Sequence, residues 1–285
     1  MKIIRTIPGM REFSAGIRRQ GRSIGFVPTM GALHEGHLSL MRVAREHADE
    51  LVASIFVNPT QFGPAEDLAK YPRPFDRDCR LAESEGCAAL FHPDAAEMYP
   101  APYHTYVTVE ELGGRLCGIS RPDHFRGVAT VVLKLLNIVA PDFAVFGQKD
   151  AQQAIVLKRM ISDLNVPVRL IVAPTVRESD GLAMSSRNVY LTAHERSDVP
   201  RIYEGLRAAQ RLFESGERSA ERLLNAARDT YNKASAFKSE YIELVDIASL
   251  SPVKTVSGPA LLAVACRTVE SNTRLIDNII PGGEI

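Results

Sequence analysis

The chain has 285 residues, a length that suggests about two domains with a sizeable core. Its apolar fraction of 45% and charged fraction of 24% are typical of a soluble globular protein, and no apolar run approaches the ~20 residues of a membrane span. The formal net charge of zero argues against a nucleic-acid partner, because general nucleic-acid binders need a basic excess to displace counterions from phosphates.

Cysteine usage and the N-terminal sequence predict a cytoplasmic protein. The cysteines, Cys79, Cys87, Cys117 and Cys266, show no C-x-x-C spacing, so neither a zinc knuckle nor a redox motif is indicated. Thiols without a disulfide framework are typical of a reducing compartment. The N-terminal stretch MKIIRTIPGMREF carries a proline, a glycine and charges where a secretory signal needs an unbroken apolar run.

The first half of the chain alternates short β-rich runs with helical patterns. Strands are expected at 23–29, 51–59, 87–93, 143–147 and 168–176. Helices are expected at 74–86, 124–139, 151–165 and around the apolar face of Leu40, Met41, Ala44 and Ala48. Strands that alternate with helices pair in parallel, with helices on both faces of the sheet. The fold class predicted for this half is therefore doubly wound α/β.

The pattern changes from about Arg177 onwards. A loop rich in Ser, Arg and Asn leads to helical stretches at 193–215 and 219–235, and strand-like runs follow at 240–247, 260–266 and 273–280. We read this part as a smaller α+β domain that could close over the first. The expected domains are thus residues 1–176 and 177–285.

The first candidate site is the segment PTMGALHEGH, between an expected strand and its helix. Ligands of open α/β sheets bind where strands end and helices begin, because a helix N-terminus offers N–H groups and partial positive charge to an anion. His34 and His37 could therefore face a phosphate, with Gly31 and Gly36 admitting the ligand to the backbone. A metal site is the competing interpretation, but HEGH lacks the spacing of the H-E-x-x-H zinc motif. The motif is short, and structural histidines are common, so it needs support from other segments.

Two further segments end expected strands with polar residues. FVNPTQF places the neutral amides of Asn58 and Gln61 where they suit a small polar substrate, although a polar turn would explain Asn58 alone. FGQKDAQQ places Lys149 as a compact charge for phosphate oxygens, next to Asp150, which could equally cap the following helix.

Two loops complete the set. GLAMSSRN supplies the hydroxyls of Ser185 and Ser186 and the guanidinium of Arg187 for pyrophosphate oxygens, with a plain serine-rich linker as the alternative. RPDHFRGV is weaker, because its histidine and second arginine could simply decorate the helix that they begin, while Arg121 could meet an anionic ligand. Together the loops are far more specific than any one of them and suit a nucleotide and a small polar acid.

These motifs resemble those of the pantothenate synthetase family. PTMGALHEGH, FVNPTQF, RPDHFRGV, FGQKDAQQ and MSSRN occur in that family's order and spacing, over essentially the whole chain. HEGH resembles the H-I-G-H signature of the nucleotidylyltransferase superfamily, and MSSRN resembles the K-M-S-K-S loop of class I aminoacyl-tRNA synthetases. The resemblance implies a Rossmann-like N-terminal domain, a smaller C-terminal lid domain and a homodimer.

The resemblance also implies a two-step reaction with ATP as substrate and Mg²⁺ as cofactor. The carboxylate of (R)-pantoate attacks the α-phosphate of Mg-ATP, giving pantoyl adenylate and pyrophosphate. The amine of β-alanine then attacks the activated acyl group, giving pantothenate and AMP. The first step needs no general base, because the carboxylate is already ionised, but it needs cations and donors around the phosphates. His37, His34 and Lys149 are the implied catalytic residues, with His37 as proton donor.

The implied binding residues follow by position. Those for ATP are Met30, Gly31, Ala32, Leu33, His34, Glu35, Gly36, His37, Gly147, Gln148, Lys149, Asp150, Val176, Met184, Ser185, Ser186 and Arg187. Those for pantoate are Gln61, Gln153 and Asn58, with Val131 and Val132 as an apolar wall, and Gln61 also borders the β-alanine position. One departure is Asp123, where the family commonly has glycine; its carboxylate could weaken an anion contact of Arg121.

Three other functions compete with this interpretation. The nearest is another adenylate-forming enzyme of the superfamily that acts on a different small acid, against which the two amide-bearing segments argue. A zinc-dependent hydrolase would use His34 and His37 and would contain stoichiometric zinc. A non-catalytic nucleotide- or RNA-binding module would bind RNA in a salt-sensitive way, which zero net charge disfavours.

Overall fold

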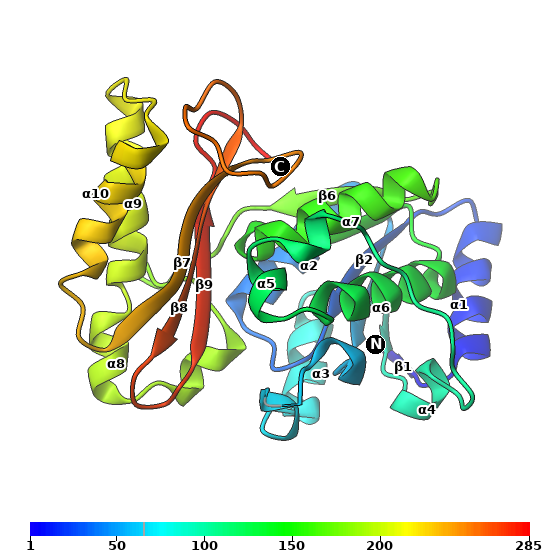
Figure 1. Cartoon of the computed structure of the whole chain (residues 1–285). Helices are drawn as coiled ribbons and strands as arrows, with labels where there is room; N and C mark the ends of the chain where they lie inside the picture. Colours follow the sequence, from blue (N-terminus) through cyan, green and yellow to red (C-terminus); the bar gives the residue numbers. More distant parts are fainter. Residues whose placement is uncertain (65) are drawn as a thin grey trace. The chain divides into compact units, whose positions relative to one another are not determined.

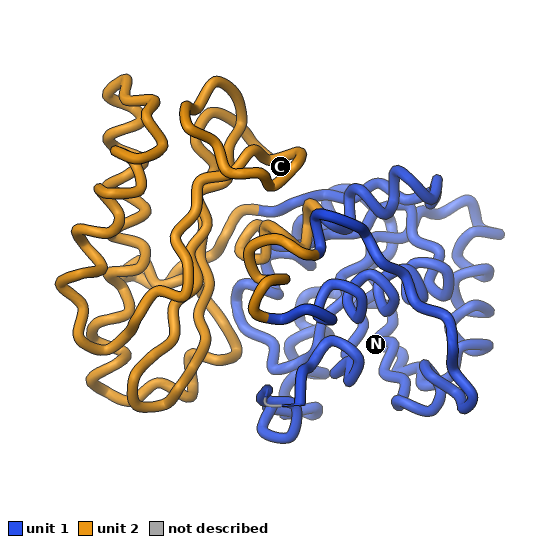
Figure 2. Tube along the Cα trace, viewed as in Figure 1, with its two compact units in different colours: residues 1–113, 121–147, 156–173 blue, residues 114–120, 148–155, 174–285 orange. Residues whose placement is uncertain are grey.

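The computed structural model describes residues 1–64 and 66–285, and contacts within the chain divide it into two compact units (Figure 2). The first unit consists of Met1–Gly113, Arg121–Gly147 and Val156–Ala173. The second consists of Gly114–Ser120, Gln148–Ile155 and Pro174–Ile285. The domain boundary expected between residues 176 and 177 stays a prediction, because a domain is defined by independent folding as well as by contacts.

The described part of the first unit contains a six-stranded sheet in which all strands pair in parallel (Figure 1). Its strands are β1 (Lys2–Ile4), β2 (Ile24–Thr29), β3 (Glu50–Ile55), β4 (Ala89–Phe91), β5 (Phe143–Gly147) and β6 (Arg169–Ala173). The spatial order is β1-β4-β3-β2-β5-β6, so the chain leaves β2 towards one edge and later returns to its other side as β5. This order confirms the doubly wound prediction and places the topological switch point between β2 and β5.

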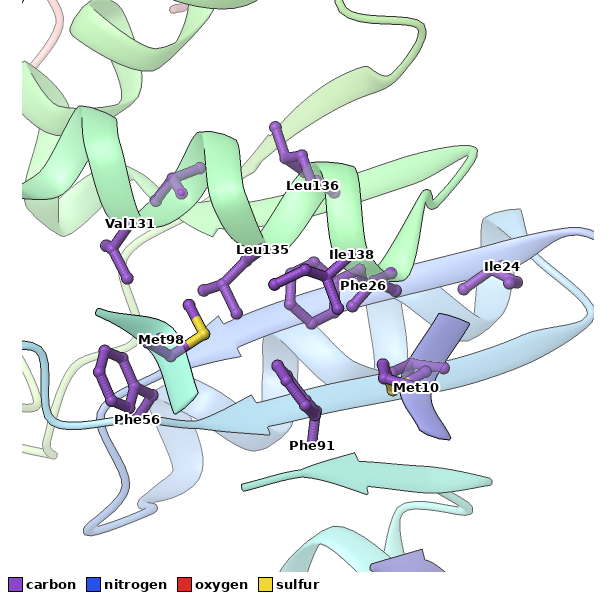
Figure 3. Packing of buried hydrophobic residues seen from close by; sticks show 14 of the residues in the cluster. Met10, Ile24, Phe26, Phe56, Phe91, Met98, Val131, Leu135, Leu136 and Ile138 are labelled. Carbon is purple, nitrogen blue, oxygen red and sulfur yellow. The ribbon is translucent and has the colours of Figure 1, made fainter. Parts of the chain in front are cut away.

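Helices cover both faces of this sheet. They are α1 (Ile7–Arg19), α2 (Glu35–His47), α3 (Phe75–Ser84), α4 (Ala95–Met98), α6 (His124–Val139) and the part of α7 (Ala151–Asp163) that begins at Val156. Alternate strand residues face opposite sides, so Phe26 packs in the core formed with α1 and α6 while Val27 packs in the core formed with α2. Figure 3 shows Leu135 and Ile138 on the side of α6 that faces the strands.

The N-terminal elements β1 and α1 were not anticipated from the sequence. The Thr6 hydroxyl accepts the N–H of Gly9 at 3.3 Å and caps α1, and Pro8 lies in the first turn. Proline is tolerated there because its missing N–H would have no partner within the helix. Pro8 and Gly9, which argue against a signal sequence, thus lie in the first turn of α1.

The second unit, which is described throughout, contains a three-stranded antiparallel sheet in the order β7-β8-β9. Its strands are β7 (Phe237–Asp246), β8 (Ala260–Thr268) and β9 (Arg274–Ile279). The helices are α5 (Cys117–Ser120), α8 (Ala193–Asp198), α9 (Arg201–Glu214) and α10 (Ala220–Tyr231). Leu206 of α9 and Leu223 of α10 are fully buried in one core with Leu262 of β8, which confirms the α+β prediction.

One expected helix is wrong in detail, and some strands are shorter than expected. The stretch 193–215 forms two helices, α8 and α9, because Pro200 lacks an N–H and its ring obstructs a continuous helix. The strand expected to reach residue 59 ends at Ile55. Among the described residues, no helix combines the length and apolarity needed to cross a bilayer.

Candidate active site

The loop after β2 has an unusual backbone that leads into α2. Gly31 and Ala32 both have positive φ, at 82° and 50°, and the Thr29 hydroxyl accepts the Gly31 N–H at 3.1 Å. Glycine takes this conformation without strain, whereas alanine does so only where the surroundings hold it. The sequence-predicted glycine at position 31 is therefore needed for the turn itself.

Asp78 of α3 holds this loop in place. Its carboxylate accepts the N–H of Ala32 at 2.7 Å and that of Leu33 at 2.8 Å, and the residue is only 1% exposed. Burial raises the pKa of Asp78, and the two backbone hydrogen bonds oppose that rise. Sequence reasoning missed this residue. The sequence does contain a signal for it. Asp78 lies three residues after Phe75 and four before Ala82, which places its carboxylate on the apolar face of an amphipathic helix.

The two histidines lie side by side at the start of α2. His34 is the N-cap residue, and its N–H donates to Nδ1 of His37 at 3.3 Å, with the ring centroids 4.1 Å apart. Because Nδ1 of His37 accepts this bond, a neutral His37 carries its proton on Nε2. His37 thus combines a defined tautomer with a position at a helix N-terminus, where anions are favoured.

The two residues between the histidines, Glu35 and Gly36, contact other residues of α2. The exposed carboxylate of Glu35 pairs with Arg42 along the helix surface, and Arg42 also pairs with Glu85 at 2.7 Å. Gly36 presents no side chain and accepts the Ser39 hydroxyl through its carbonyl at 2.8 Å.

Among the described residues, no group of three His, Cys, Asp or Glu side chains is arranged to hold a metal ion.

Asn58 and Gln61, which follow β3, are directly connected. The Asn58 amide donates to Oε1 of Gln61 at 3.0 Å and to the Gly127 carbonyl at 3.2 Å, while the Tyr99 hydroxyl donates to Oδ1 of Asn58 at 2.8 Å. Burial raises the pKa of Tyr99 to about 12, so its hydroxyl stays protonated and keeps donating. Gln61 in turn donates to the sulfur of Met30 at 3.2 Å. Asn58, 1% exposed, therefore orients Gln61 beside the loop after β2.

The backbone of Gln61 is held by the start of α6. Its carbonyl lies 2.9 Å from Nδ1 of His124 and accepts from Nη2 of Arg121 at 3.3 Å. Arg121 also makes a two-pronged ion pair with Glu66, at 2.7 and 2.6 Å. Burial tends to raise the pKa of Glu66, but the Arg121 hydrogen bond and charge outweigh it and hold the pKa below its usual range. Arg121 thus acts within the protein, through Glu66 and the Gln61 carbonyl.

Asp123 does not take part in this ion pair. Its side chain is 84% exposed, and it lies 4.0 Å from Arg126, whose guanidinium is 3.8 Å from the centre of the Tyr106 ring. The aspartate that departs from the family pattern therefore has its carboxylate at the protein surface.

Val131 and Val132 belong to the hydrophobic core of the first unit. Each is 5% exposed, and Figure 3 shows Val131 on α6 close to the apolar side chains beneath the helix. Their expected role as an apolar wall for pantoate stays a prediction.

Gly147 ends β5, next to β2 in the sheet. A Cβ on Gly147 would meet Cδ2 of Leu40 of α2 at 3.9 Å, so the carboxyl end of β5 lies against the helix that begins with the two histidines. The first unit therefore brings together Met30–His37, Asn58, Gln61 and Gly147 at one edge of the sheet.

The second unit contains the remaining predicted residues. Gln148–Asp150 form a 3₁₀ turn, η4, in which Nζ of Lys149 lies 3.9 Å from Oδ1 of Asp150. Lys149 is 21% exposed in its side chain and Asp150 is 48% exposed. Gln153 follows on α7 and is half-buried.

Val176 and Met184 are paired across a tight hairpin. The Met184 N–H donates to the Val176 carbonyl at 3.0 Å, and Arg177 and Ala183 form an antiparallel bridge between them. The Ser185 hydroxyl accepts the Arg187 N–H at 3.2 Å and caps a second 3₁₀ turn, η5 (Ser186–Tyr190). The second unit thus holds two separate groups of predicted ligand-binding residues, one at η4 and one at this hairpin.

A doubly wound sheet with a polar, glycine-containing loop at its switch point defines a class, the α/β proteins that bind a ligand where strands end and helices begin. The chain matches the family described as pantoate-beta-alanine ligase over residues 2–280. A pantothenate synthetase of Pelotomaculum thermopropionicum is 54% identical over 282 residues, which cover 99% of each chain.

Solved structures agree with this match. Pantothenate synthetase from Thermus thermophilus has a TM-score of 0.93 at 42% identity and covers 99% of this chain and 100% of its own. Pantoate-beta-alanine ligase from Francisella tularensis, complexed with beta-gamma ATP and beta-alanine, has a TM-score of 0.80 at 34% identity, with 99% and 98% covered. The chain belongs to the pantoate–β-alanine ligase family and is an enzyme of the ligase class.

Proposed function

We propose that the protein condenses (R)-pantoate with β-alanine in an ATP-dependent reaction that passes through pantoyl adenylate and releases pyrophosphate and AMP. The observation that carries this proposal is the histidine pair at the switch point, where His37 has its tautomer set by the His34 N–H. The family membership and the ATP and β-alanine complex of the Francisella relative support it.

In the first step, pantoate needs no base, because its carboxylate is ionised at neutral pH. The protein has to stabilise the charge that builds on the phosphates, which preorganised donors do most effectively. His37 would donate through Nε2, His34 would contact the phosphates beside it, and the N-terminus of α2 would add its partial charge. The N–H groups of Ala32 and Leu33 are engaged by Asp78, so their part is to shape the loop.

Lys149 would supply a further cation at the α-phosphate. Its segment follows Gly147 directly in the chain, and Gly147 ends the strand next to β2, the region where ligands of open α/β sheets bind. The nucleotide site would be completed by the hairpin residues Val176 and Met184 and by Ser185, Ser186 and Arg187.

Pantoate and β-alanine would meet at Gln61. The Asn58 amide orients the Gln61 side chain through Oε1, and His124 and Arg121 hold the Gln61 backbone through its carbonyl. A fixed orientation is what a group that recognises a small polar acid requires. Gln153 would bind pantoate from the other segment, with Val131 and Val132 behind it.

Magnesium would enter with ATP. This ion is commonly held by one or two carboxylates together with substrate phosphates, and the half-exposed carboxylate of Asp150 fits that donor type. When bound, it would neutralise charge on the phosphates. A homodimer, implied by the family resemblance, and a cytoplasmic location, indicated by the cysteine pattern and the N-terminal sequence, complete the proposal.

The test is pantoate-dependent exchange of labelled pyrophosphate into ATP, with magnesium and without β-alanine. Exchange that requires pantoate is the expected result and would establish the adenylate step. No exchange from folded protein that binds ATP would contradict pantoate as the acid, and other small carboxylates would then be screened in the same assay.

A further inference from the structure

The two groups of predicted ATP-binding residues in the second unit are far apart in sequence, yet both are fastened to adjacent residues of β9. These residues are Asp277, 4% exposed, and Asn278, 3% exposed. Neither lies in any of the five motifs that resemble the family's. Neighbouring residues of a strand face opposite sides of the sheet, so one dipeptide can reach two different loops.

Asn278 holds the η4 turn. Its amide donates to the backbone carbonyls of Gln148 at 2.9 Å and of Lys149 at 3.0 Å, and its Oδ1 accepts from the side-chain Nε2 of Gln148 at 3.4 Å. Two donors of one buried amide thus bind two successive backbone carbonyls, which fixes the direction of the peptide that carries the Lys149 side chain. Buried backbone carbonyls need such partners, because leaving them unpaired is costly.

Asp277 holds the hairpin between Val176 and Met184. Its carboxylate makes a two-pronged ion pair with Arg177, at 2.6 and 2.9 Å, and the Arg177 guanidinium lies 3.5 Å from the centre of the Tyr203 ring of α9. Arg177 also donates to the Gly181 carbonyl at 3.1 Å inside the hairpin. A planar guanidinium held by three such partners has one orientation, and so does the hairpin that it belongs to.

We infer that Asp277 and Asn278 are positioning residues for nucleotide binding, each acting through a different segment: Asn278 through Gln148–Lys149, and Asp277 through the hairpin that leads to Met184–Arg187. This inference rests on the proposed function, because it takes Lys149 and Arg187 to be ATP contacts. Because both segments are attached to the same dipeptide, Lys149 and Arg187 are positioned before the nucleotide binds.

The experiment is a crossed pair of double-mutant cycles on the full chain. Asn278→Ala and Asp277→Asn are each combined with Lys149→Ala and with Arg187→Ala, and kcat/KM for ATP and the Kd of ATP are measured. We expect Asn278→Ala alone to lower kcat/KM for ATP by ~10–10²-fold, because small misplacements of contacts are costly. That loss should largely vanish in the Lys149→Ala background and persist in the Arg187→Ala background. Asp277→Asn should show the reverse pattern, because interacting residues are non-additive.

Thr273→Val is the matched control. Thr273 is similarly buried, at 5%, and its hydroxyl, which the change removes, lies 2.7 Å from the Ser271 hydroxyl just before β9 begins, away from both held segments. It should lower the melting temperature without changing kcat/KM for ATP. If Asn278→Ala does not fold, Asn278→Ser, which keeps a small hydrogen-bonding side chain, replaces it in the cycles.

The outcomes separate the inference from the proposed function. Normal kcat/KM for ATP in both Lys149→Ala and Arg187→Ala would overturn the ATP roles of these segments and the inference with them. The inference alone would be overturned if Lys149→Ala and Arg187→Ala greatly lowered kcat/KM for ATP while Asn278→Ala and Asp277→Asn had no effect on it. It would also be overturned if Asn278→Ala and Asp277→Asn lowered kcat/KM equally in both backgrounds.

Discussion

In the first unit, the predicted ligand-binding residues follow strands of one parallel sheet. In the second unit they lie on turns that continue the chain after β5 and β6 and that are held by side chains of β9, a strand much later in the chain. Met30–His37, Gln61 and Gly147 reach one edge because the carboxyl ends of neighbouring parallel strands meet there. Gln148–Asp150 and the hairpin before Met184 instead rely on side chains of Asp277 and Asn278.

The difference is in what holds a loop in place. A doubly wound topology determines where a strand ends, so the first unit needs side chains only to shape a loop, as Asp78 does for Ala32 and Leu33. The two turns of the second unit do not connect strands of its antiparallel sheet, so the topology of that sheet does not fix where they lie. The second unit uses buried charged and amide groups for this purpose. Four predictions test that contrast, in order of expected effect.

The largest effect should come from removing one proposed phosphate contact in each unit. His37→Ala and Lys149→Ala should each lower turnover by ~10²–10³-fold, the usual loss for one donor to a charged transition state. Steady-state kinetics with all three substrates would measure it, with the exposed Asn137→Ala as a surface control. A loss smaller than about tenfold in either variant would contradict that residue's role.

The second unit should be the more acid-sensitive part. Glu195 is fully buried and accepts the N–H groups of Thr192, Glu270 and Ser271 at 2.8–3.0 Å. Burial opposes ionisation, but these hydrogen bonds outweigh it and hold the pKa of Glu195 at about 2. Because this pKa is lowered in the folded protein, the stabilisation is complete above the unfolded value near 4.5 and is lost as the pH falls towards 2.

Glu195→Gln should therefore lower the free energy of unfolding at pH 7 by up to about 3 kcal/mol, since one pKa unit corresponds to about 1.4 kcal/mol. The deficit should shrink as the pH is lowered below 4.5 in chemical denaturation experiments. The exposed Glu221→Gln should show no comparable deficit. A deficit of constant size between pH 7 and about pH 3 would contradict the ionic origin.

In the first unit, the close approach of α6 to the turn before Gln61 should tolerate no side chain. A Cβ on Gly127 would lie 2.3 Å from the Thr60 carbonyl oxygen and 2.7 Å from Cα of Gln61. Gly127→Ala should destabilise the protein by about 2 kcal/mol, the usual cost of overpacking, and raise the KM for pantoate by shifting Gln61.

Gly16→Ala is the matched change in another helix of the same unit. A Cβ there would meet only the end of the Arg19 side chain, at 3.9 Å, so this variant should be stabilised by about 0.5–1 kcal/mol. Thermal denaturation of both variants measures the contrast. Equal melting temperatures would contradict the prediction, because they would mean that the turn at Thr60 and Gln61 shifts enough to accommodate the new methyl group.

The smallest effect should come from Asp78→Asn. The asparagine amide has one oxygen that can still accept a backbone N–H, but its NH₂ group would face the other N–H. One of the two hydrogen bonds to Ala32 and Leu33 is therefore lost. Removal of a buried charge with a raised pKa offsets part of the loss, which leaves about 1 kcal/mol. The KM for ATP should rise modestly, while the exposed Asp76→Asn on the same helix should leave both quantities unchanged. An unaltered KM for ATP would show that the loop holds its shape without Asp78.

Several parts of the fold could be predicted because they depend on local pattern. The boundaries of α6 and β5 agree with the expected ranges, since an apolar periodic stretch followed by Pro141 and a short β-rich run leave few alternatives. The two histidines were expected at a helix start, and His34 is the N-cap residue of α2. The ligand roles of all candidate residues stay predictions until the kinetics above are measured.

Other features had no reliable local signal. Nothing near Arg121 indicates that its partner is Glu66, 55 positions away, or that it also holds the Gln61 carbonyl. Asn58 was expected as a substrate amide, and the structure shows it buried against Gln61, Gly127 and Tyr99. Such pairings depend on which elements pack together, and one sequence does not contain that information.

The sequence by itself determined the class of fold, the family and the segments that carry polar residues at strand ends, because periodicity and motif spacing are local properties of the chain. Only the tertiary structure decided which of those residues are held by others: Asp78 on the loop after β2, Asn58 on Gln61, and Asp277 and Asn278 on two separate turns. The physical reason is that a buried polar group must find its partners in the packed structure, and those partners come from wherever the fold brings the chain together.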